Sequence, residues 1–178
     1  MIRLVIFDRD GVINELIEES GAKRSPRKVS EVKVNPDIKT LMRNLDARGI
    51  FMAIASNQPE ISRGFIDEAT LFEINSRILE VLELNIGFHI CLHDDVDNCF
   101  CRKPKPGLLF EILRECDIQI DEAIFIGDRL VDALAAAAAG MKFLQYQGGG
   151  PGTFKYLAEG KEEIMSGEES VFKWISNQ

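Results

Sequence analysis

Three short, continuous apolar runs, each followed at once by polar residues, constrain the fold of this 178-residue chain most strongly. They cover residues 2–7, in which Arg3 is the one polar residue, and residues 50–55 and 123–127. Continuous rather than alternating hydrophobicity is typical of strands that are buried on both faces of a parallel sheet. Helical patterns lie between the runs, so the sequence predicts an α/β fold with a doubly wound, mainly parallel sheet and right-handed crossovers.

Four amphipathic or alanine-rich segments predict the helices of this fold. We expect one helix from Asn35-Pro36 to Gly49, a longer one over 66–84, one opened by Pro106 and one over 130–139. Two weaker strands are expected over 88–92 and 141–146.

A glycine-rich stretch, Gly148 to Gly152, interrupts the alternation of strands and helices. We therefore expect a core of residues 1–147 and a C-terminal segment of residues 148–178. The scattered apolar residues of this segment predict one or two helices packed on the core.

The formal net charge of −8 argues against general affinity for nucleic acids or anionic membranes. No apolar run approaches the ~20 residues that a membrane span needs, and the first residues lack the pattern of a signal peptide. We expect a cytoplasmic protein without nucleic-acid or membrane partners, and a monomer by default.

Acids and hydroxyls follow all three strong strands. Asp8 and Asp10 come after the first run, Ser56 and Asn57 after the second, and Asp128 after the third. Because open α/β sheets bind ligands at the carboxyl ends of their strands, we expect these side chains to lie at one rim.

Several carboxylates at one place repel each other and raise their own pKa values unless a cation is present. Asp8, Asp10 and Asp128 therefore indicate a divalent metal, and oxygen ligands favour Mg²⁺. Mg²⁺ held by few protein groups leaves positions for phosphate oxygens, which favours phosphoryl transfer. Taken singly, each aspartate could equally be a helix cap or a turn residue.

A second signal is the pattern C-x-H-x5-C-x-C over residues 91–101. Three thiolates and one imidazole, from Cys91, His93, Cys99 and Cys101, match a tetrahedral structural Zn²⁺ site. The alternative is a cysteine-rich turn with fortuitous spacing. Zinc would fix the loop that leads directly into Arg102-Lys103.

Four motifs in order resemble those of the haloacid dehalogenase (HAD) superfamily: residues 8–14, Ser56-Asn57-Gln58, Arg102-Lys103-Pro104 and Gly127-Asp128 with Asp132. The resemblance covers residues 2 to about 146. It implies a HAD-like Rossmannoid fold, and the short segments between the motifs leave no room for a large cap domain.

The resemblance also implies a role for each motif residue. Asp8 would be the nucleophile and an Mg²⁺ ligand, and Asp128 would complete the metal ligands. Asp10 would protonate the leaving oxygen and then activate water, while its backbone carbonyl binds Mg²⁺. Ser56 and Lys103 would hold the phosphoryl oxygens.

Three further residues have implied or open roles. Asn57 and Arg102 would bind substrate together with Lys103. Asp132 would orient Lys103 or a metal-bound water, or would only suit the helix dipole in the first turn of its helix.

The zinc loop before Arg-Lys-Pro resembles that of the D-glycero-D-manno-heptose 1,7-bisphosphate 7-phosphatases and of the histidinol-phosphate phosphatases. This implies an Mg²⁺-dependent phosphatase that hydrolyses a small phosphate monoester through an aspartyl-phosphate, with the heptose bisphosphate as the favoured substrate. Histidinol phosphate or another sugar phosphate is the alternative. A nucleic-acid 3′-phosphatase and a catalytically silent scaffold are disfavoured.

Three loops depart from the pattern of these phosphatases. The zinc loop is short, residues 15–20 lack the usual Gly-Tyr-Val, and Pro59 to Gly64 replaces Ser-Gly-Ile-Ala-Arg-Gly. The basic stretch 23–28 would meet a second phosphate or carboxylate, or would be a solvated loop.

Overall fold

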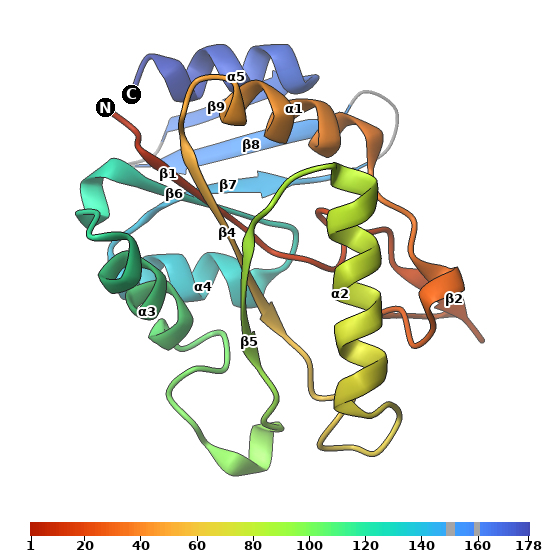
Figure 1. Cartoon of the computed structure of the whole chain (residues 1–178). Helices are drawn as coiled ribbons and strands as arrows, with labels where there is room; N and C mark the ends of the chain where they lie inside the picture. Colours follow the sequence, from red (N-terminus) through yellow and green to blue (C-terminus); the bar gives the residue numbers. More distant parts are fainter. Residues whose placement is uncertain (149–151, 159–160) are drawn as a thin grey trace.

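The computed structural model describes residues 1–148, 152–158 and 161–178. A seven-stranded sheet with the order β5-β4-β1-β6-β7-β8-β9 runs through the molecule (Figure 1). Its strands are β1 (Leu4–Phe7), β4 (Phe51–Asn57), β5 (Gly87–Cys91), β6 (Ala123–Gly127), β7 (Lys142–Tyr146), β8 (Thr153–Ala158) and β9 (Lys161–Ser166). The first five strands in this order are parallel, and β8 and β9 pair in antiparallel fashion. The predicted mainly parallel α/β sheet is confirmed.

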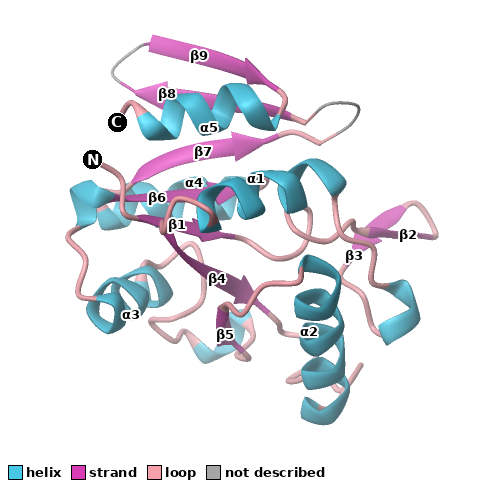
Figure 2. Ribbon diagram, turned by 45° about the horizontal axis from the view of Figure 1, so that its top comes forward, coloured by secondary structure: helices cyan, strands magenta, loops and turns pink. Residues whose placement is uncertain are grey.

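Helices cover both faces of the sheet (Figure 2). The helices are α1 (Pro36–Asp46), α2 (Glu68–Leu82), α3 (Gly107–Cys116), α4 (Leu130–Ala139) and α5 (Glu168–Ser176). Side chains alternate along β1: Val5 and Phe7 pack with α1, α2 and α5, whereas Leu4 and Ile6 pack with α3 and α4. Burial on both faces explains why the strand reads as an unbroken apolar run. None of the described helices combines the length and apolarity that crossing a membrane requires.

The insertion between β1 and α1 is small. It holds a hairpin of β2 (Ile17–Glu19) and β3 (Ala22–Arg24) and a 3-10 turn, Val29–Glu31. Two further 3-10 turns lie at Asp95–Asp97 and Ile120–Glu122. The described residues form no large cap domain, as expected.

The C-terminal segment differs from the prediction of helices alone. Its described residues form the strands β8 and β9, which extend the sheet beyond β7, and then the helix α5. Phe154 and Met165 are buried while Ile164 is exposed, so this region follows the two-residue period of a strand. That short alternation is easily mistaken for scattered helical positions. The predicted glycine-rich break falls largely on residues 149–151, outside the described residues.

Candidate active site

The carboxyl ends of β1, β4 and β6 meet at one rim of the sheet, because β1 pairs with both neighbours. Asp8, Ser56 and Asp128 come from these three ends. Together with Lys103 they line one cavity of about 630 Å³, the main cavity. The topology therefore brings together the residues that the three sequence motifs predict.

Lys103 joins the cluster from a loop far away in the sequence. Its Nζ lies 2.5 Å from Oδ1 of Asp8 and 2.6 Å from Oδ1 of Asp132, and it donates a 3.0 Å hydrogen bond to the backbone oxygen of Ala55. The side chain is almost fully buried. One ammonium group is thus held between two carboxylates at the floor of the main cavity.

Asn57 holds the backbone of this loop. Its Oδ1 accepts a hydrogen bond from the Lys103 backbone N–H at 3.1 Å, and its Nδ2 donates to the Lys103 backbone oxygen at 2.9 Å. Both ends of the amide are therefore used to position Lys103. Substrate binding by Asn57, which also lines the main cavity, stays a prediction.

The carboxylates at the rim repel one another, and burial has removed much of their hydration. Burial, with smaller contributions from Asp132 and Asp10, raises the pKa of Asp8 to about 8 despite the opposing charge of Lys103. Burial and then Asp132 raise the pKa of Asp128 to about 6. Burial alone would lower the pKa of Lys103, but Asp8 and Asp132 outweigh it and raise that pKa. The single lysine does not neutralise the cluster.

This donor set suits a hard divalent cation. Asp8, Asp128 and Asp132 each offer one oxygen, and these atoms lie within 4.8 Å of one another. Oδ1 of Asp128 is buried without a hydrogen-bond partner in the described part of the chain. An orphaned, buried carboxylate oxygen among other carboxylates fits Mg²⁺. The side chain of Asp10 is absent from this group.

Gly11 allows Asp128 to approach the first motif. Its φ is +98°, which side-chain-bearing residues rarely adopt, and a Cβ atom there would collide with the Asp128 carboxylate. Sterics therefore explain why the Asp-x-Asp-Gly motif has glycine at this position.

The Asp10 carboxylate points into a buried hydrogen-bond network. Arg9, which has no exposed surface, donates from Nε and Nη2 to the two Asp10 oxygens at 3.1 and 2.8 Å. Arg9 also donates to Gln58 Oε1 at 2.7 Å and to Asn75 Oδ1 at 2.8 Å. Gln58 Nε2 donates to Asp10 at 2.7 Å and to Ser56 Oγ at 2.8 Å. The network fixes both Asp10 and Ser56 relative to β1 and β4.

Sequence reasoning gave Arg9, Gln58 and Asn75 no role. Arg9 and Gln58 lie inside the recognised motifs, but the sequence around each residue does not show that their side chains face each other. Asn75 could have been found from the sequence pattern. It is a polar residue on the apolar side of α2, next to Ile74, and it is buried there.

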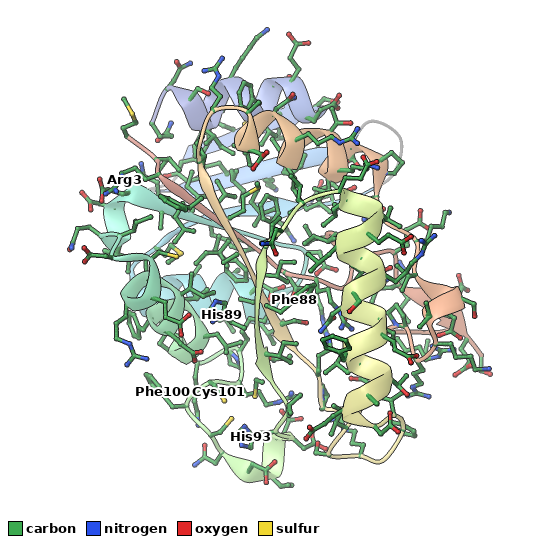
Figure 3. The ribbon with its side chains drawn as sticks, in the orientation of Figure 1. Arg3, Phe88, His89, His93, Phe100 and Cys101 are labelled. Atoms are coloured by element: carbon green, nitrogen blue, oxygen red, sulfur yellow. The ribbon has the colours of Figure 1, made fainter. Side chains whose placement is uncertain are left out.

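The four predicted zinc ligands converge in the loop after β5, where Figure 3 shows His93 and Cys101. The Cys101 sulfur lies 3.4 Å from those of Cys91 and Cys99 and 3.3 Å from Nδ1 of His93. Cys91 lies 3.6 Å from both Cys99 and His93 Nδ1. Zn–S bonds of about 2.3 Å in a tetrahedron require sulfur atoms roughly 3.8 Å apart, so these side chains fit a metal with little movement.

His89 lies in β5 and faces α3. Its Nδ1 is 3.3 Å from Oε1 of Glu111, and its Nε2 is 3.8 Å from Oε2 of Glu115. These carboxylates come from a different element, which the local sequence could not reveal.

Cations surround the mouth of the main cavity. They are Lys23, Arg24, Arg27, Arg63, Arg102 and Arg129. Arg102 is largely committed to the zinc loop, since it donates to Asp95 Oδ1 at 2.7 Å and to the His93 backbone oxygen at 3.1 Å. Lys23 lines this cavity without an ion pair to a carboxylate of the described residues, whereas the charge of Arg129 acts on the neighbouring Asp128. This acidic chain therefore carries a basic entrance to its site.

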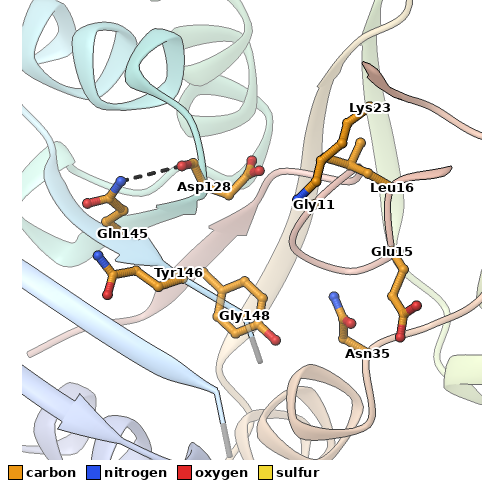
Figure 4. Close-up of a pocket in the computed structure, with 10 residues that line it drawn as sticks. Gly11, Glu15, Leu16, Lys23, Asn35, Asp128, Gln145, Tyr146 and Gly148 are labelled. Carbon is orange, nitrogen blue, oxygen red and sulfur yellow. Dashed lines mark hydrogen bonds between the residues drawn. The ribbon is translucent and has the colours of Figure 1, made fainter. Parts of the chain in front are cut away.

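A side cavity of about 530 Å³ adjoins the other flank of Asp128. Figure 4 shows Lys23 extending toward Gly11, and Gln145 donating to the Asp128 backbone oxygen at 3.4 Å. Leu16, Lys23 and Asp128 line both cavities, so the two spaces meet at the carboxylate cluster.

Comparisons with known proteins agree with this site. Residues 23–140 match the family model described as haloacid dehalogenase-like hydrolase. A D-glycero-beta-D-manno-heptose-1,7-bisphosphate 7-phosphatase of Neisseria meningitidis is 34% identical over 146 residues, which cover 79% of this chain and 75% of that protein. A D-glycero-alpha-D-manno-heptose-1,7-bisphosphate 7-phosphatase of Campylobacter jejuni is 33% identical over 142 residues, 77% of each chain.

A solved structure is similar over the whole fold. The D,D-heptose 1,7-bisphosphate phosphatase from B. bronchiseptica, complexed with magnesium and phosphate, superposes with a TM-score of 0.81 at 27% identity, covering 99% of each chain. That protein contains the two ligands for which the carboxylate cluster and its lysine are suited.

Proposed function

Because this chain belongs to the haloacid dehalogenase-like hydrolases and is a phosphatase of that family, we propose that it removes the 7-phosphate from D-glycero-D-manno-heptose 1,7-bisphosphate. The names of the similar proteins support this substrate. They include both anomers, so the proposal is made for the heptose bisphosphate without an anomeric preference.

The observation that carries the substrate proposal is the basic entrance beside an acidic reaction centre. A bisphosphate brings one phosphate to the carboxylate cluster and a second that needs cations elsewhere. Both Lys23 and Arg129 line the main cavity; Lys23 has no ion pair with a described carboxylate, and Arg129 stands beside Asp128. An ester with a single phosphate would leave them unused.

We assign the metal to Asp8 and Asp128, with the Asp10 backbone carbonyl as a third protein ligand. Bound Mg²⁺ would screen the repulsion between the Asp8 carboxylate and the incoming phosphate. Asp132 lies in the same carboxylate group, and its contact with Lys103 gives it the role of holding that lysine.

In the proposed reaction, an Asp8 oxygen attacks phosphorus while the bond from phosphorus to the sugar oxygen breaks. Asp10 gives its proton to that leaving oxygen. Lys103 and the Ser56 hydroxyl hold the phosphoryl oxygens where negative charge develops. Asp10, now a base, takes a proton from water, whose oxygen attacks phosphorus and releases Asp8.

We further propose that Cys91, His93, Cys99 and Cys101 hold a structural Zn²⁺. Four protein ligands leave no open position for catalysis. The metal would instead stiffen the loop that carries Arg102 and Lys103, whose backbone is also tied to Asn57.

The test is a parallel rate assay with Mg²⁺ on D-glycero-D-manno-heptose 1,7-bisphosphate, histidinol phosphate and a panel of sugar monophosphates. We expect kcat/KM for the heptose bisphosphate to exceed the others by about 100-fold or more, as differential binding of a second phosphate allows. Equal rates across the panel would leave a phosphatase of this family but reject the substrate. A preference for histidinol phosphate would identify the alternative.

A further inference from the structure

Glu60 is a carboxylate in the main cavity that lies outside the cluster described above. It follows β4, is 8% exposed, and its Oε2 is buried without a hydrogen-bond partner in the described residues. It lines the same cavity as Asp8 and Lys103. A buried carboxylate oxygen that has lost water and gained no donor destabilises the folded protein, so it requires an explanation.

The surrounding turn keeps this carboxylate at the cavity. The Glu60 backbone oxygen accepts a hydrogen bond from the Phe65 N–H at 2.8 Å, and the Arg63 N–H donates to the Pro59 oxygen at 2.9 Å. These bonds close residues 59–65 into a turn, and the Glu60 side chain on this turn is buried at the cavity wall.

An unmatched donor lies in the wall of the same cavity. Nε of Arg27 is buried without a hydrogen-bond partner in the described part of the chain, and the guanidinium carbon stacks 3.8 Å from the centroid of the Phe65 ring. The wall therefore presents an unmatched acceptor on Glu60 and an unmatched donor on Arg27. A hydroxyl group can satisfy both kinds of atom, because it has one O–H donor and two acceptor lone pairs.

The charge around the cavity decides between a hydroxyl and an ammonium group as the donor. The cavity is lined by six cationic side chains besides Lys103 and by five carboxylates. The Arg63 cation already acts on Glu60, so a neutral hydroxyl suits this part of the wall better than a second cation. We propose that Glu60 is a specificity-determining residue that accepts a hydrogen bond from a hydroxyl group of the substrate, so that the site selects polyhydroxylated phosphate esters. This inference rests on one part of the proposed function, namely that the phosphate ester binds in the main cavity.

The experiment compares wild type, Glu60→Ala and Glu60→Gln on the heptose bisphosphate, on a hexose 6-phosphate and on p-nitrophenyl phosphate, whose aryl group carries no hydroxyl. We expect Glu60→Ala to lower kcat/KM about 10- to 100-fold for the two sugars, mainly through KM, and less than about threefold for the aryl ester. Glu60→Gln keeps one acceptor oxygen and falls between. Glu73→Ala, which removes an exposed carboxylate on α2, is the control and changes none of these rates.

Thermal unfolding separates recognition from a structural role. An unpartnered buried carboxylate does not stabilise the ligand-free protein, so Glu60→Ala should keep or raise the Tm. A lower Tm with equal losses on all three substrates, or no loss on the sugars, overturns the inference. If wild type prefers the hexose phosphate and Glu60→Ala removes that preference, the heptose substrate is rejected while the role of Glu60 stands.

Discussion

The ammonium group of Lys103 lies 2.6 Å from Oδ1 of Asp132, a carboxylate that is 1% exposed. Lys103 also contacts Asp8, so the two carboxylates hold the lysine from two sides. Its other oxygen, Oδ2 of Asp132, accepts a 3.1 Å hydrogen bond from the Arg129 backbone N–H at the start of α4. Two of the roles that the sequence left open for Asp132, orienting Lys103 and stabilising the first turn of its helix, are therefore compatible with this geometry.

Replacing Asp132 tests this contact. Asp132→Asn should lower kcat/KM by roughly 30-fold, because an ion pair that contributes about 2 kcal/mol no longer fixes Lys103. Steady-state kinetics with Mg²⁺ measure the change. Asp121→Asn, an exposed carboxylate at the amino end of β6, is the control and should keep the wild-type rate. Equal rates for both variants would contradict the assignment.

Asp8 should be indispensable as the nucleophile. Asp8→Asn retains the shape of the side chain but removes the attacking oxygen, so turnover should fall by at least about 10⁴-fold, as for other nucleophile removals. Far-UV circular dichroism and Tm should stay near wild type. A folded Asp8→Asn protein with near-normal turnover would refute the covalent route.

Asn75 should affect the leaving-group step although it lies away from the main cavity lining. Asn75→Leu removes the acceptor for Arg9 Nη1, so Arg9, and with it the Asp10 carboxylate, is held less firmly. Hydrolysis of an alkyl phosphate, whose leaving oxygen needs a proton, should fall about tenfold, and that of p-nitrophenyl phosphate much less. Asn75→Asp keeps an acceptor and should restore the alkyl rate. Equal losses on both substrates would indicate a purely structural effect.

The purified protein should contain about one zinc ion per chain, bound in one four-ligand site. Elemental analysis of protein prepared without chelators measures this content. Cys99→Ser should lose the metal and lower kcat/KM through the loop that carries Lys103. Cys116→Ser, which changes a thiol outside the cluster, is the matched control. Wild-type protein without zinc, or equal metal content in the two variants, would reject the site.

Tyr146 gives the folded protein a pH dependence in alkali. Burial and the 2.9 Å hydrogen bond that its hydroxyl donates to Asp37 raise the pKa of the phenol above its ordinary value of 10.0. The folded state thus holds the phenolic proton more tightly than the unfolded chain does. The resulting stabilisation is complete below about pH 10 and is lost as the pH rises through the folded pKa.

Tyr146→Phe removes this stabilisation. The free energy of unfolding should fall by about 1 kcal/mol at neutral pH, and its decline between about pH 10 and about pH 11 should be shallower than in wild type. Urea unfolding across this range measures both quantities. Identical pH slopes for the two proteins would show that another group governs the alkaline loss.

The amino-acid sequence by itself determined the parallel core and the position of the candidate site. Strands buried on both faces must be apolar without interruption, and polar residues can follow only where each strand ends. Asp8, Ser56 and Asp128 each follow such a run, so their sequence positions already imply one shared rim, which the pairing of β1 with β4 and β6 produces. The cluster of four predicted zinc ligands was equally recognisable, because all four residues lie within the segment 91–101.

The tertiary structure alone decided which polar groups face each other. Lys103 contacts Asp8 and Asp132, Arg9 contacts Asn75, and Oε2 of Glu60 has no partner among the described residues. These directions depend on packing between elements that are far apart in the chain, whereas a sequence motif reports only residue type and spacing. The strands β8 and β9 escaped prediction for the same reason, since their register is set by pairing with β7 rather than by a local pattern.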